Sequence, residues 1–504
     1  MPTLVDALGR GDPHEVAALI AAGHDIHYTR EYGYTALLDA VHSRDVLRDE
    51  KLLELLELLV ANGVALDAVS SYGESALRVL SRLGRFDAVR LLLDAGADEG
   101  QLAWTPLMRA VALGSFDDVQ RAIDAGAALE ATDWWHRTAF AIACLTGDVA
   151  KIQLLFDRGA NADVAGRIAP PLFYAIDGGH SAAVRWLLDA GADVNQMDDS
   201  GVTALMHAAE ADNAPAVDLL VSAGADVDRD VFGTALSRAR GRAVIERLLA
   251  AGADPANLTN EGRRALAGLP PDPDERLLDA TLEEFRRAQT RRFGAGNPEP
   301  MDEPFWLAMI RSGVNAWAAT QKFEPGMTIQ RDPIWCAQRF GQSLTCLPDG
   351  RIVFVAGEHE DHYDPDFCIY NDVFVHAPDG SIAIFGYPED VFPPTDFHTA
   401  TLVDGSIYVI GSLGYQGTRR VGETPVFRLD LATFRMERLE PRGDAPGWIY
   451  KHRADLLDAR EVAVHGGTVV KSRDGKEVHE PNADAFVLDL DRLIWRRVSW
   501  RPFP

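Results

Sequence analysis

One glycine recurs at nearly fixed spacing through the first half of this 504-residue chain. It follows a short apolar segment each time and occupies eight positions: Gly23, Gly63, Gly96, Gly126, Gly159, Gly191, Gly224 and Gly252. Successive gaps are 40, 33, 30, 33, 32, 33 and 28 residues. This period is typical of repeat proteins, in which each unit has one apolar face that it buries only against its neighbours. The first half is therefore expected to form a solenoid.

The unit from Asp199 to Asp228 shows how one repeat is built. Thr203–Ala209 predicts a short helix, and Val217, Leu220 and Val221 place an apolar face at i, i+3 and i+4 on a second helix. Gly224 then ends that helix, because glycine readily takes the left-handed conformation of a C-cap. Two short helices joined to an extended turn resemble the ankyrin repeat. The resemblance implies a helical solenoid with exposed turns that binds other proteins.

Departures from the regular spacing predict local changes. Residues 4–26 resemble a degenerate N-terminal cap, and the 40-residue gap contains a leucine-rich insertion that predicts an elongated second helix. Pro170-Pro171 replaces the usual Thr-Pro and should stiffen the entry to its helix. The last unit is shortened, and Glu261–Leu269 is expected to be a truncated capping helix. Residues 1–268 are thus assigned to a solenoid of about seven repeats with caps.

Residues 269–325 are expected to be a proline-rich linker with connector helices. One helical stretch is predicted from Glu275 to Phe293, and a second helix from Glu303 to about Phe323 with Asp302 as its N-cap. The apolar stripe of the second helix indicates that it packs between domains. Its members are Trp306, Met309, Ile310, Val314 and Trp317.

The remainder, residues 326–504, changes from helical to alternating periodicity. Asp349-Gly350, Asp379-Gly380 and Asp404-Gly405 each separate two short runs of branched residues, which predicts β-hairpins. Residues 340–358, 397–414 and 451–467 resemble the kelch repeat of β-propellers, although the paired glycines are intact only at Gly466-Gly467. Three units are visible, fewer than the four blades of the smallest usual propeller. They could close, stay open or pair with another chain, and the residues around Trp335 could add an outer strand.

The predicted fold class is therefore multidomain α + β: an ankyrin-repeat solenoid, a helical connector and a small kelch-like antiparallel β-domain forming a partial propeller. The net charge of −27 argues against nucleic acid or an anionic membrane as the main partner. It favours solubility, and it leaves a basic protein partner open. Arginine-rich, alanine-rich composition is a hint of a bacterial source.

The four cysteines form no CxxC pair, so reduced, mostly buried thiols of a cytoplasmic protein are expected. The N-terminus shows no signal-peptide pattern, and no apolar run approaches the roughly 20 residues that span a bilayer. GxSxG, P-loop and dinucleotide-binding motifs are also missing. We therefore expect no catalytic residues, no cofactor and no metal, and the protein is not expected to be an enzyme.

The densest polar cluster, Glu358–Asp364, is the main alternative. Carboxylates and imidazoles can hold a metal ion, but this segment lacks a metal-ligand spacing, so a solvated loop or a partner contact is the favoured interpretation. His398 and His452 recur at the start of two kelch-like units and are interpreted as structural. Cys144 is interpreted as a core thiol.

Large aromatic residues precede the repeat helices, on the turns that ankyrin repeats expose. Tyrosine and tryptophan dominate protein-interface hot spots, which favours a binding strip along these turns. The candidate partner-binding residues are Tyr32, Tyr34, Tyr72, Trp104, Trp134, Trp135, His136 and Phe232. Consecutive turns should place Tyr72, Trp104 and Trp135 in a row.

These observations predict a non-enzymatic protein-binding module. The narrower hypothesis is an inhibitor or immunity protein that neutralises an effector, such as a basic toxin, through the concave face of the solenoid. One alternative is an enzyme, or a small-ligand or metal-binding protein, with its site in the kelch-like domain. Another is a plain scaffold.

Overall fold

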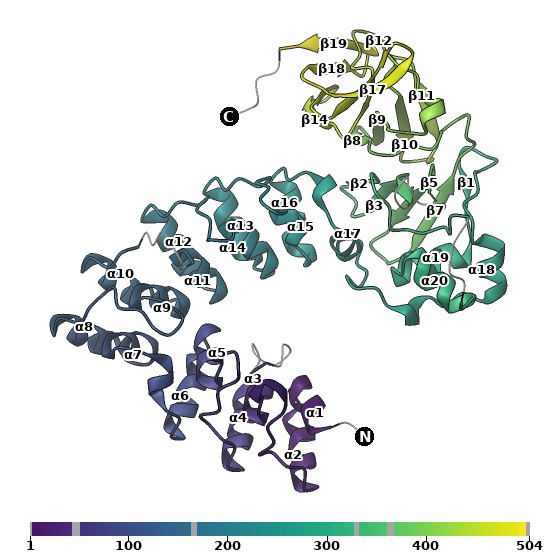
Figure 1. Cartoon of the computed structure of the whole chain (residues 1–504). Helices are drawn as coiled ribbons and strands as arrows, with labels where there is room; N and C mark the ends of the chain where they lie inside the picture. Colours follow the sequence, from purple (N-terminus) through teal and green to yellow (C-terminus); the bar gives the residue numbers. More distant parts are fainter. Residues whose placement is uncertain (1–2, 43–50, 163–168, 327–331, 360–366, 500–504) are drawn as a thin grey trace. The chain divides into compact units, whose positions relative to one another are not determined.

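The computed structural model describes residues 3–42, 51–162, 169–326, 332–359 and 367–499 (Figure 1). The chain divides into two compact units. The first contains residues 1–239 and 243–253, and the second contains residues 240–242 and 254–504. The capping helix expected at the end of the solenoid is α17 (Asn260–Leu266), and it belongs to the second unit.

The first unit is a series of antiparallel helix pairs stacked side by side (Figure 1). The pairs are α1 (Leu4–Arg10) with α2 (Pro13–Ala21), α3 (Ala36–Val41) with α4 (Lys51–Ala61), α5 (Ala76–Arg82) with α6 (Phe86–Asp94), α7 (Pro106–Leu113) with α8 (Phe116–Asp124), α9 (Ala139–Thr146) with α10 (Val149–Asp157), α11 (Pro171–Asp177) with α12 (Ser181–Asp189), α13 (Ala204–Glu210) with α14 (Ala214–Ser222), and α15 (Ala235–Arg238) with α16 (Arg242–Ala250). Most second helices have nine residues, and α4 has eleven, as expected for its elongated repeat.

Side-chain caps and glycines set the helix boundaries. In six helix pairs a Ser or Thr hydroxyl accepts the backbone N–H three residues ahead and begins the first helix: Thr3, Ser75, Thr105, Thr138, Thr203 and Thr234. All eight recurring glycines have left-handed φ angles, between 77° and 99°. The predicted role of Gly224 and its equivalents is confirmed.

The repeat after Gly96 departs from this pattern. Its turn is short, which explains the 30-residue gap, and it contains a 3₁₀ helix, η2 (Glu99–Leu102), that packs against α5. The next turn, which precedes α9, extends past this short repeat and contacts the α5–α6 repeat. Arg137 donates to the backbone oxygen of Ser81 (2.8 Å) and to its hydroxyl (2.7 Å), and forms an ion pair with Asp133 at 2.6 Å. Helices α5 and α9 are thereby joined across an intervening repeat.

Replacing Arg137 by Met should destabilise the first unit by roughly 3–5 kcal/mol, because the Asp133 carboxylate would stay buried without its counter-charge. The two side chains are only 2% and 1% exposed. The measurement is urea-induced loss of helical circular dichroism. Arg121→Met is the matched control, since its ion pair with Asp118 is exposed to solvent and should contribute little to stability. Equal shifts for the two variants would contradict the expectation.

The second unit begins with short helical segments. These are η3 (Pro255–Asn257), α17, η4 (Glu275–Leu277), α18 (Leu282–Ala288), α19 (Pro304–Ser312) and α20 (Ala316–Phe323). Two predictions for the connector were wrong. The stretch from Glu275 to Phe293 contains only η4 and α18, and the helix expected from Glu303 to Phe323 is two helices. Gly313 ends α19 with a left-handed φ of 66°, and Asn315, not Asp302, supplies a side-chain cap, for α20.

Three four-stranded antiparallel meanders follow, and each repeats the same strand order. The first contains β2 (Ser343–Cys346), β3 (Ile352–Val355), β6 (Val373–His376) and β7 (Ile382–Gly386). The second contains β8 (Thr399–Val403), β9 (Ser406–Ile410), β10 (Val426–Asp430) and β11 (Met436–Leu439). The third contains β14 (Arg453–Asp458), β15 (Glu461–His465), β18 (Ala485–Asp489) and β19 (Ile494–Val498). None of these sheets closes on itself within the described residues.

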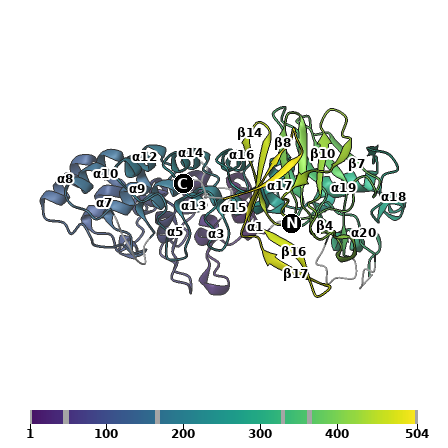
Figure 2. The same ribbon diagram turned by 90° about the horizontal axis from the view of Figure 1, so that it is seen from above.

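Shorter strands pair with the meanders or form small separate sheets. β1 (Glu299–Pro300) pairs with β7 and β12 (Arg442–Gly443) with β19, while β4 (Glu358–His359) pairs with β5 (Cys368–Ile369). β13 (Trp448–Tyr450), β16 (Thr468–Arg473) and β17 (Lys476–Pro481) form a separate sheet, whose β16–β17 hairpin projects from the other strands (Figure 2). The outer strand of the C-terminal sheet, which we expected from the region of Trp335, is instead β12. All three predicted Asp-Gly hairpins are present, but only Asp404-Gly405 has positive φ at both residues.

The three meanders pack face to face through two apolar cores. Val353, Val375 and Phe427 belong to the core between the first and second sheets, and Ile410, Val464 and Trp495 to the core between the second and third. Strand β8 packs between β2 and β14. The backbone N–H of Phe397 donates to Gly341 (2.8 Å), and that of Lys451 donates to Phe397 (2.9 Å). The same contact is therefore repeated from one sheet to the next.

Two buried histidines form a side-chain contact that is likewise repeated from one sheet to the next. His398 Nε2 lies 2.7 Å from Ser343 Oγ, and His452 Nε2 lies 3.0 Å from Thr399 Oγ1. Within the described chain their Nδ1 atoms are buried without a hydrogen-bond partner. Burial lowers the pKa of both imidazoles to about 3. The structural role predicted for the two residues agrees with this arrangement.

The second unit should therefore lose stability in mild acid. Because the folded-state pKa values lie below the unfolded value of about 6.5, the unfolded chain binds more protons as the pH falls through that value. As the pH falls below about 6.5, the free energy of unfolding should therefore decline by up to roughly 1.4 kcal/mol per pH unit for each histidine. Urea midpoints followed by tryptophan fluorescence at pH 7.5 and 5.0 measure this slope. His398→Gln with His452→Gln should flatten it, whereas His14→Gln, at an exposed position, should not.

Candidate functional site

The turns of the first unit hold the predicted partner-binding residues in two kinds of environment. Tyr32, Tyr72 and Phe232 are exposed, with exposed fractions of 58%, 63% and 91%. His136 is exposed as well. The rest are half-buried: Tyr34, Trp104, Trp134 and Trp135. The structure thus separates residues that present aromatic surface to solvent from residues that contribute to packing.

Three of these aromatic residues form a continuous surface, which we call the aromatic strip: Tyr32, Tyr72 and Trp134. The rings of Tyr32 and Tyr72 are 5.5 Å apart, and the Ser71 N–H donates to the Tyr32 carbonyl at 2.8 Å, so the two turns are fixed to each other. A side-chain carbon at Gly73 would lie 3.4 Å from the Trp134 ring, which therefore lies beside the Tyr72 turn. Tyr32 has a left-handed φ of 62°, which places it at the tip of its turn.

Trp134 and Trp135 also attach their turn to α5. The Trp135 indole N–H donates to the Arg78 carbonyl at 2.9 Å, and the Arg78 guanidinium lies 4.2 Å from the centre of the Trp134 ring. The two indoles contact each other edge to face at 4.6 Å. Such cation–π and edge-to-face contacts contribute roughly 0.5–1.5 kcal/mol each. Trp135 is consequently part of the repeat packing.

Trp104 does not continue the row that we expected between Tyr72 and Trp135. Its ring packs 6.1 Å from that of Phe86 at the edge of the core, because η2 replaces the extended turn. Trp134 occupies the place beside Tyr72 instead. Tyr34 packs against His42 and the Arg30 guanidinium, which is paired with Asp39. The three-residue deficit in the Gly96–Gly126 gap was the only sequence signal of this change.

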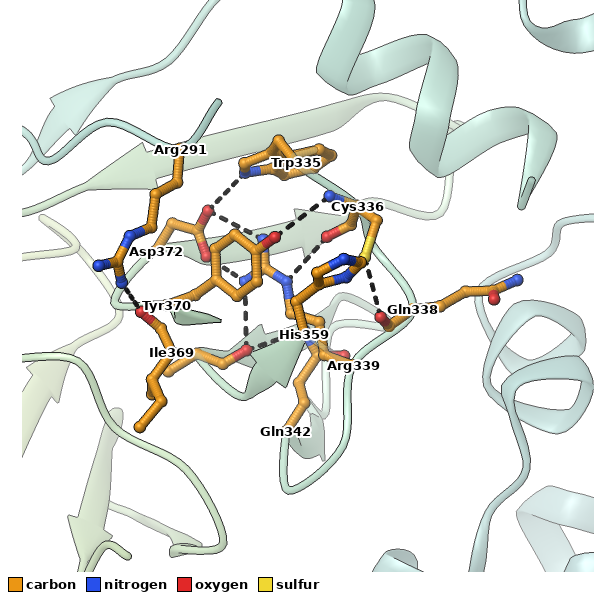
Figure 3. Close-up of polar contacts among 11 residues, drawn as sticks. Arg291, Trp335, Cys336, Gln338, Arg339, Gln342, His359, Ile369, Tyr370 and Asp372 are labelled. Atoms are coloured by element: carbon orange, nitrogen blue, oxygen red, sulfur yellow. Dashed lines mark hydrogen bonds and ion pairs between the residues drawn. The ribbon is translucent and has the colours of Figure 1, made fainter. Parts of the chain in front are cut away.

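The second unit contains a buried polar cluster around Arg339 (Figure 3). Its guanidinium forms an ion pair with Asp372 and donates to the carbonyl of Cys336 at 2.9 Å. Trp335 donates to Asp372 at 3.0 Å and stacks on Trp306, with ring centres 4.8 Å apart. These contacts join the segment before β2, the start of β6 and helix α19. Sequence reasoning missed the cluster, since no local pattern relates residues 33 positions apart.

A thiol and an imidazole meet beside this cluster. Cys336 Sγ lies 2.8 Å from His359 Nδ1, and the Cys336 N–H donates to the Tyr370 hydroxyl at 3.4 Å. Burial raises the pKa of Tyr370 well above its usual value. A Cys–His pair can act in nucleophilic catalysis when substrate reaches the sulfur. Both side chains are only 2% exposed, so this pair contributes first to packing.

The metal-binding alternative depended on Glu358–Asp364. Glu358 and His359 form β4, and the remaining five residues of that segment lie outside the described residues. In the ranges that the structure describes, no three His, Cys, Asp or Glu side chains gather as they would around a metal ion. No helix in those ranges is long and apolar enough to cross a membrane.

Comparison with known proteins agrees with the geometry of the first unit. The ankyrin-repeat family model matches three times, at residues 47–133, 107–198 and 172–260. This part of the chain consists of ankyrin repeats, a module of protein–protein interaction. Its helix pairs and protruding turns are those of that class.

Similar curated proteins match over part of their length only. Ankyrin repeat protein nuc-2 of Neurospora crassa is 30% identical over 168 residues, 32% of this chain and 16% of that protein. L-asparaginase of Dirofilaria immitis is 29% identical over 162 residues, 31% of this chain and 27% of that protein. Among solved structures, the crystal structure of the human ASB11 ankyrin repeat domain is 22% identical in sequence and has a TM-score of 0.23. The match covers 51% of this chain and all of that domain. The chain spans less than a third of the curated relatives' length.

Thiol accessibility tests the burial of the Cys336–His359 pair. All four cysteines are thiols, and only Cys346 is exposed, whereas Cys144, Cys336 and Cys368 are buried. A disulfide reagent such as DTNB should therefore modify one thiol rapidly in the native protein and four after unfolding. Cys346→Ser should abolish the rapid reaction. Rapid reaction that persists in that variant and is lost when Cys336→Ser is added would instead reveal an accessible, activated Cys336.

Proposed function

We propose that the protein acts by binding a protein partner, without catalysis, through the turns of its ankyrin repeats. The aromatic strip carries the proposal. Tyr32 and Tyr72 are more than half exposed although their rings contact each other, and large aromatic side chains gain strongly from burial. Trp134, from the turn two repeats further along the chain, extends the same surface. A partner covering these three residues would bury aromatic area already held in position.

Charged groups beside the strip are paired with one another. This pairing limits the local support for the narrower hypothesis, in which the partner is a basic effector. Glu74 lies 3.3 Å from His42 and 3.6 Å from Arg82, and Arg78 lies over Trp134. The local surface is mixed in charge, while the whole chain carries −27. We propose an inhibitor or immunity protein for a basic effector as the narrower function, supported by this overall charge. Long-range attraction would then accelerate association, and the strip would provide most of the affinity.

For the second unit we propose a degenerate kelch-like origin. Ala356, Gly411 and Gly466 are spaced 55 residues apart and all have left-handed φ angles, of 55°, 78° and 64°. Each follows the second strand of its meander, where kelch units carry paired glycines. The three buried thiols support a reducing compartment such as the cytoplasm as the place of action.

Substitutions in the strip test the proposed function. Tyr32→Ala and Tyr72→Ala should each raise the partner's dissociation constant roughly tenfold or more, since truncating an aromatic hot spot commonly costs about 2 kcal/mol. Partners captured from the source cell are titrated against both variants. Phe156→Ala is the matched control, because Phe156 is a half-exposed aromatic paired with Trp186 on the second helices. Trp104→Ala and Trp135→Ala are poorer reporters, since both side chains contribute to packing.

Two outcomes would contradict the proposal that the aromatic strip binds the partner. Unchanged affinity in both tyrosine variants would show that the strip is not the binding site. Retention of the partner by residues 254–504 alone would place the site on the second unit.

A further inference from the structure

A cavity of about 40 Å³ lies within the second unit between α17, α19 and the first meander. Its apolar wall includes Leu269, Ile310, Phe354 and Phe374. Its polar wall combines two arginines with amide side chains and one imidazole: Arg263, Arg264, Asn260, Gln338, Gln342 and His376. Among the described residues that line it, none is Asp or Glu. The cavity thus has a positively charged side and an apolar side.

Arg264 is fixed by the protein itself. Its guanidinium donates to the carbonyls of Pro270, Ile310 and Arg311 at 2.8–3.0 Å, and any side chain at Gly313 would collide with it. These three acceptors take one N–H from each of its three nitrogens and supply no formal negative charge. Arg264 therefore contributes a positive charge that is fixed in position beside the cavity.

Arg263 has donor capacity left over. Nε donates to the Leu258 carbonyl at 3.3 Å and Nη1 to the Gln342 carbonyl at 3.0 Å. Its Nη2 makes no hydrogen bond, and the guanidinium no ion pair, with the described residues. Burial lowers the pKa of Arg263 to about 10, so it remains charged at neutral pH. A half-buried guanidinium with an unused N–H favours an anionic partner that completes its hydrogen bonds.

His376 supplies a second unused polar group. It is 6% exposed, packs edge to face on Phe354 at 5.3 Å, and within the described chain its ring nitrogens make no hydrogen bond. Burial and the Arg264 charge lower its pKa to about 4. At neutral pH the imidazole is neutral, so it offers one donor and one acceptor. A buried polar side chain of this kind, lining a cavity, normally satisfies its hydrogen bonds with water or a ligand.

We propose that this cavity binds a small aliphatic monocarboxylate, with its carboxylate on Arg263 and its alkyl end against Phe354 and Phe374. The volume accommodates roughly three waters, or a chain of about two to four carbons. An inorganic anion would leave the apolar wall unused. The site is independent of the protein-binding function proposed for the repeats.

Titration calorimetry of the full chain with propionate, propionamide and inorganic phosphate tests the proposal. Propionate should bind in the millimolar range that suits so small a ligand. Propionamide has the same shape without the charge and should bind at least tenfold more weakly. Phosphate should also bind more weakly, because it makes no apolar contact.

Variants locate the site. Arg263→Gln should weaken propionate binding at least tenfold, and Ala337→Leu should reduce it by filling the cavity. Arg311→Gln, which removes an exposed arginine from the same helical region, should bind like the wild type. Circular dichroism verifies folding, and Arg263→Lys replaces the Gln variant if that one unfolds. Failure of propionate to bind, equal binding of propionamide, or unchanged binding in the Arg263 and Ala337 variants would show that the cavity holds only water.

Discussion

Every repeat in this chain depends on burying an apolar face that it cannot cover alone. In the first unit the faces belong to short helix pairs, and in the second they belong to four-stranded meanders. Burial of a single Leu or Val contributes roughly 1.5–3 kcal/mol before chain entropy is subtracted, so a lone pair or sheet would not persist. Stacking supplies the missing surface in both units. The terminal members of each stack therefore need separate cover.

The second unit covers one end of its stack with the connector. Trp335 lies on Phe374 of the first meander, and Trp306 stacks on Trp335 in turn. The Arg339–Asp372 pair lies at the same place, and Arg339 also donates to the Cys336 carbonyl of the covering segment. A meander facing water there would expose Phe354 and Phe374. The connector is thus part of the fold of the second unit, more than a spacer.

Local rules predicted the elements that depend on neighbouring residues. Thr203 and Gly224 define a repeat through hydrogen bonds and backbone freedom within a few positions, and Asp404-Gly405 defines its hairpin in the same way. The break at Gly313 was missed because the apolar stripe continues through it, although Asn315 was a readable cap. Contacts between distant residues, such as Arg339 with Asp372 or Trp134 beside Gly73, have no local signal. The aromatic residues of the candidate site could be named from sequence, but their separation into exposed and packed groups required the structure.

The bridge from Arg137 to Ser81 changes how the first unit can open. In an ideal array each repeat contacts only its neighbours, so unfolding can begin or stop at any boundary. Here the Arg137–Ser81 and Trp135–Arg78 hydrogen bonds tie together repeats that have another between them. Residues from about 75 to 146 must then open and close as one cooperative block. Trp134 lies within that block and Tyr72 directly precedes it, so a ligand held by both residues would resist fraying that begins at either end of the array.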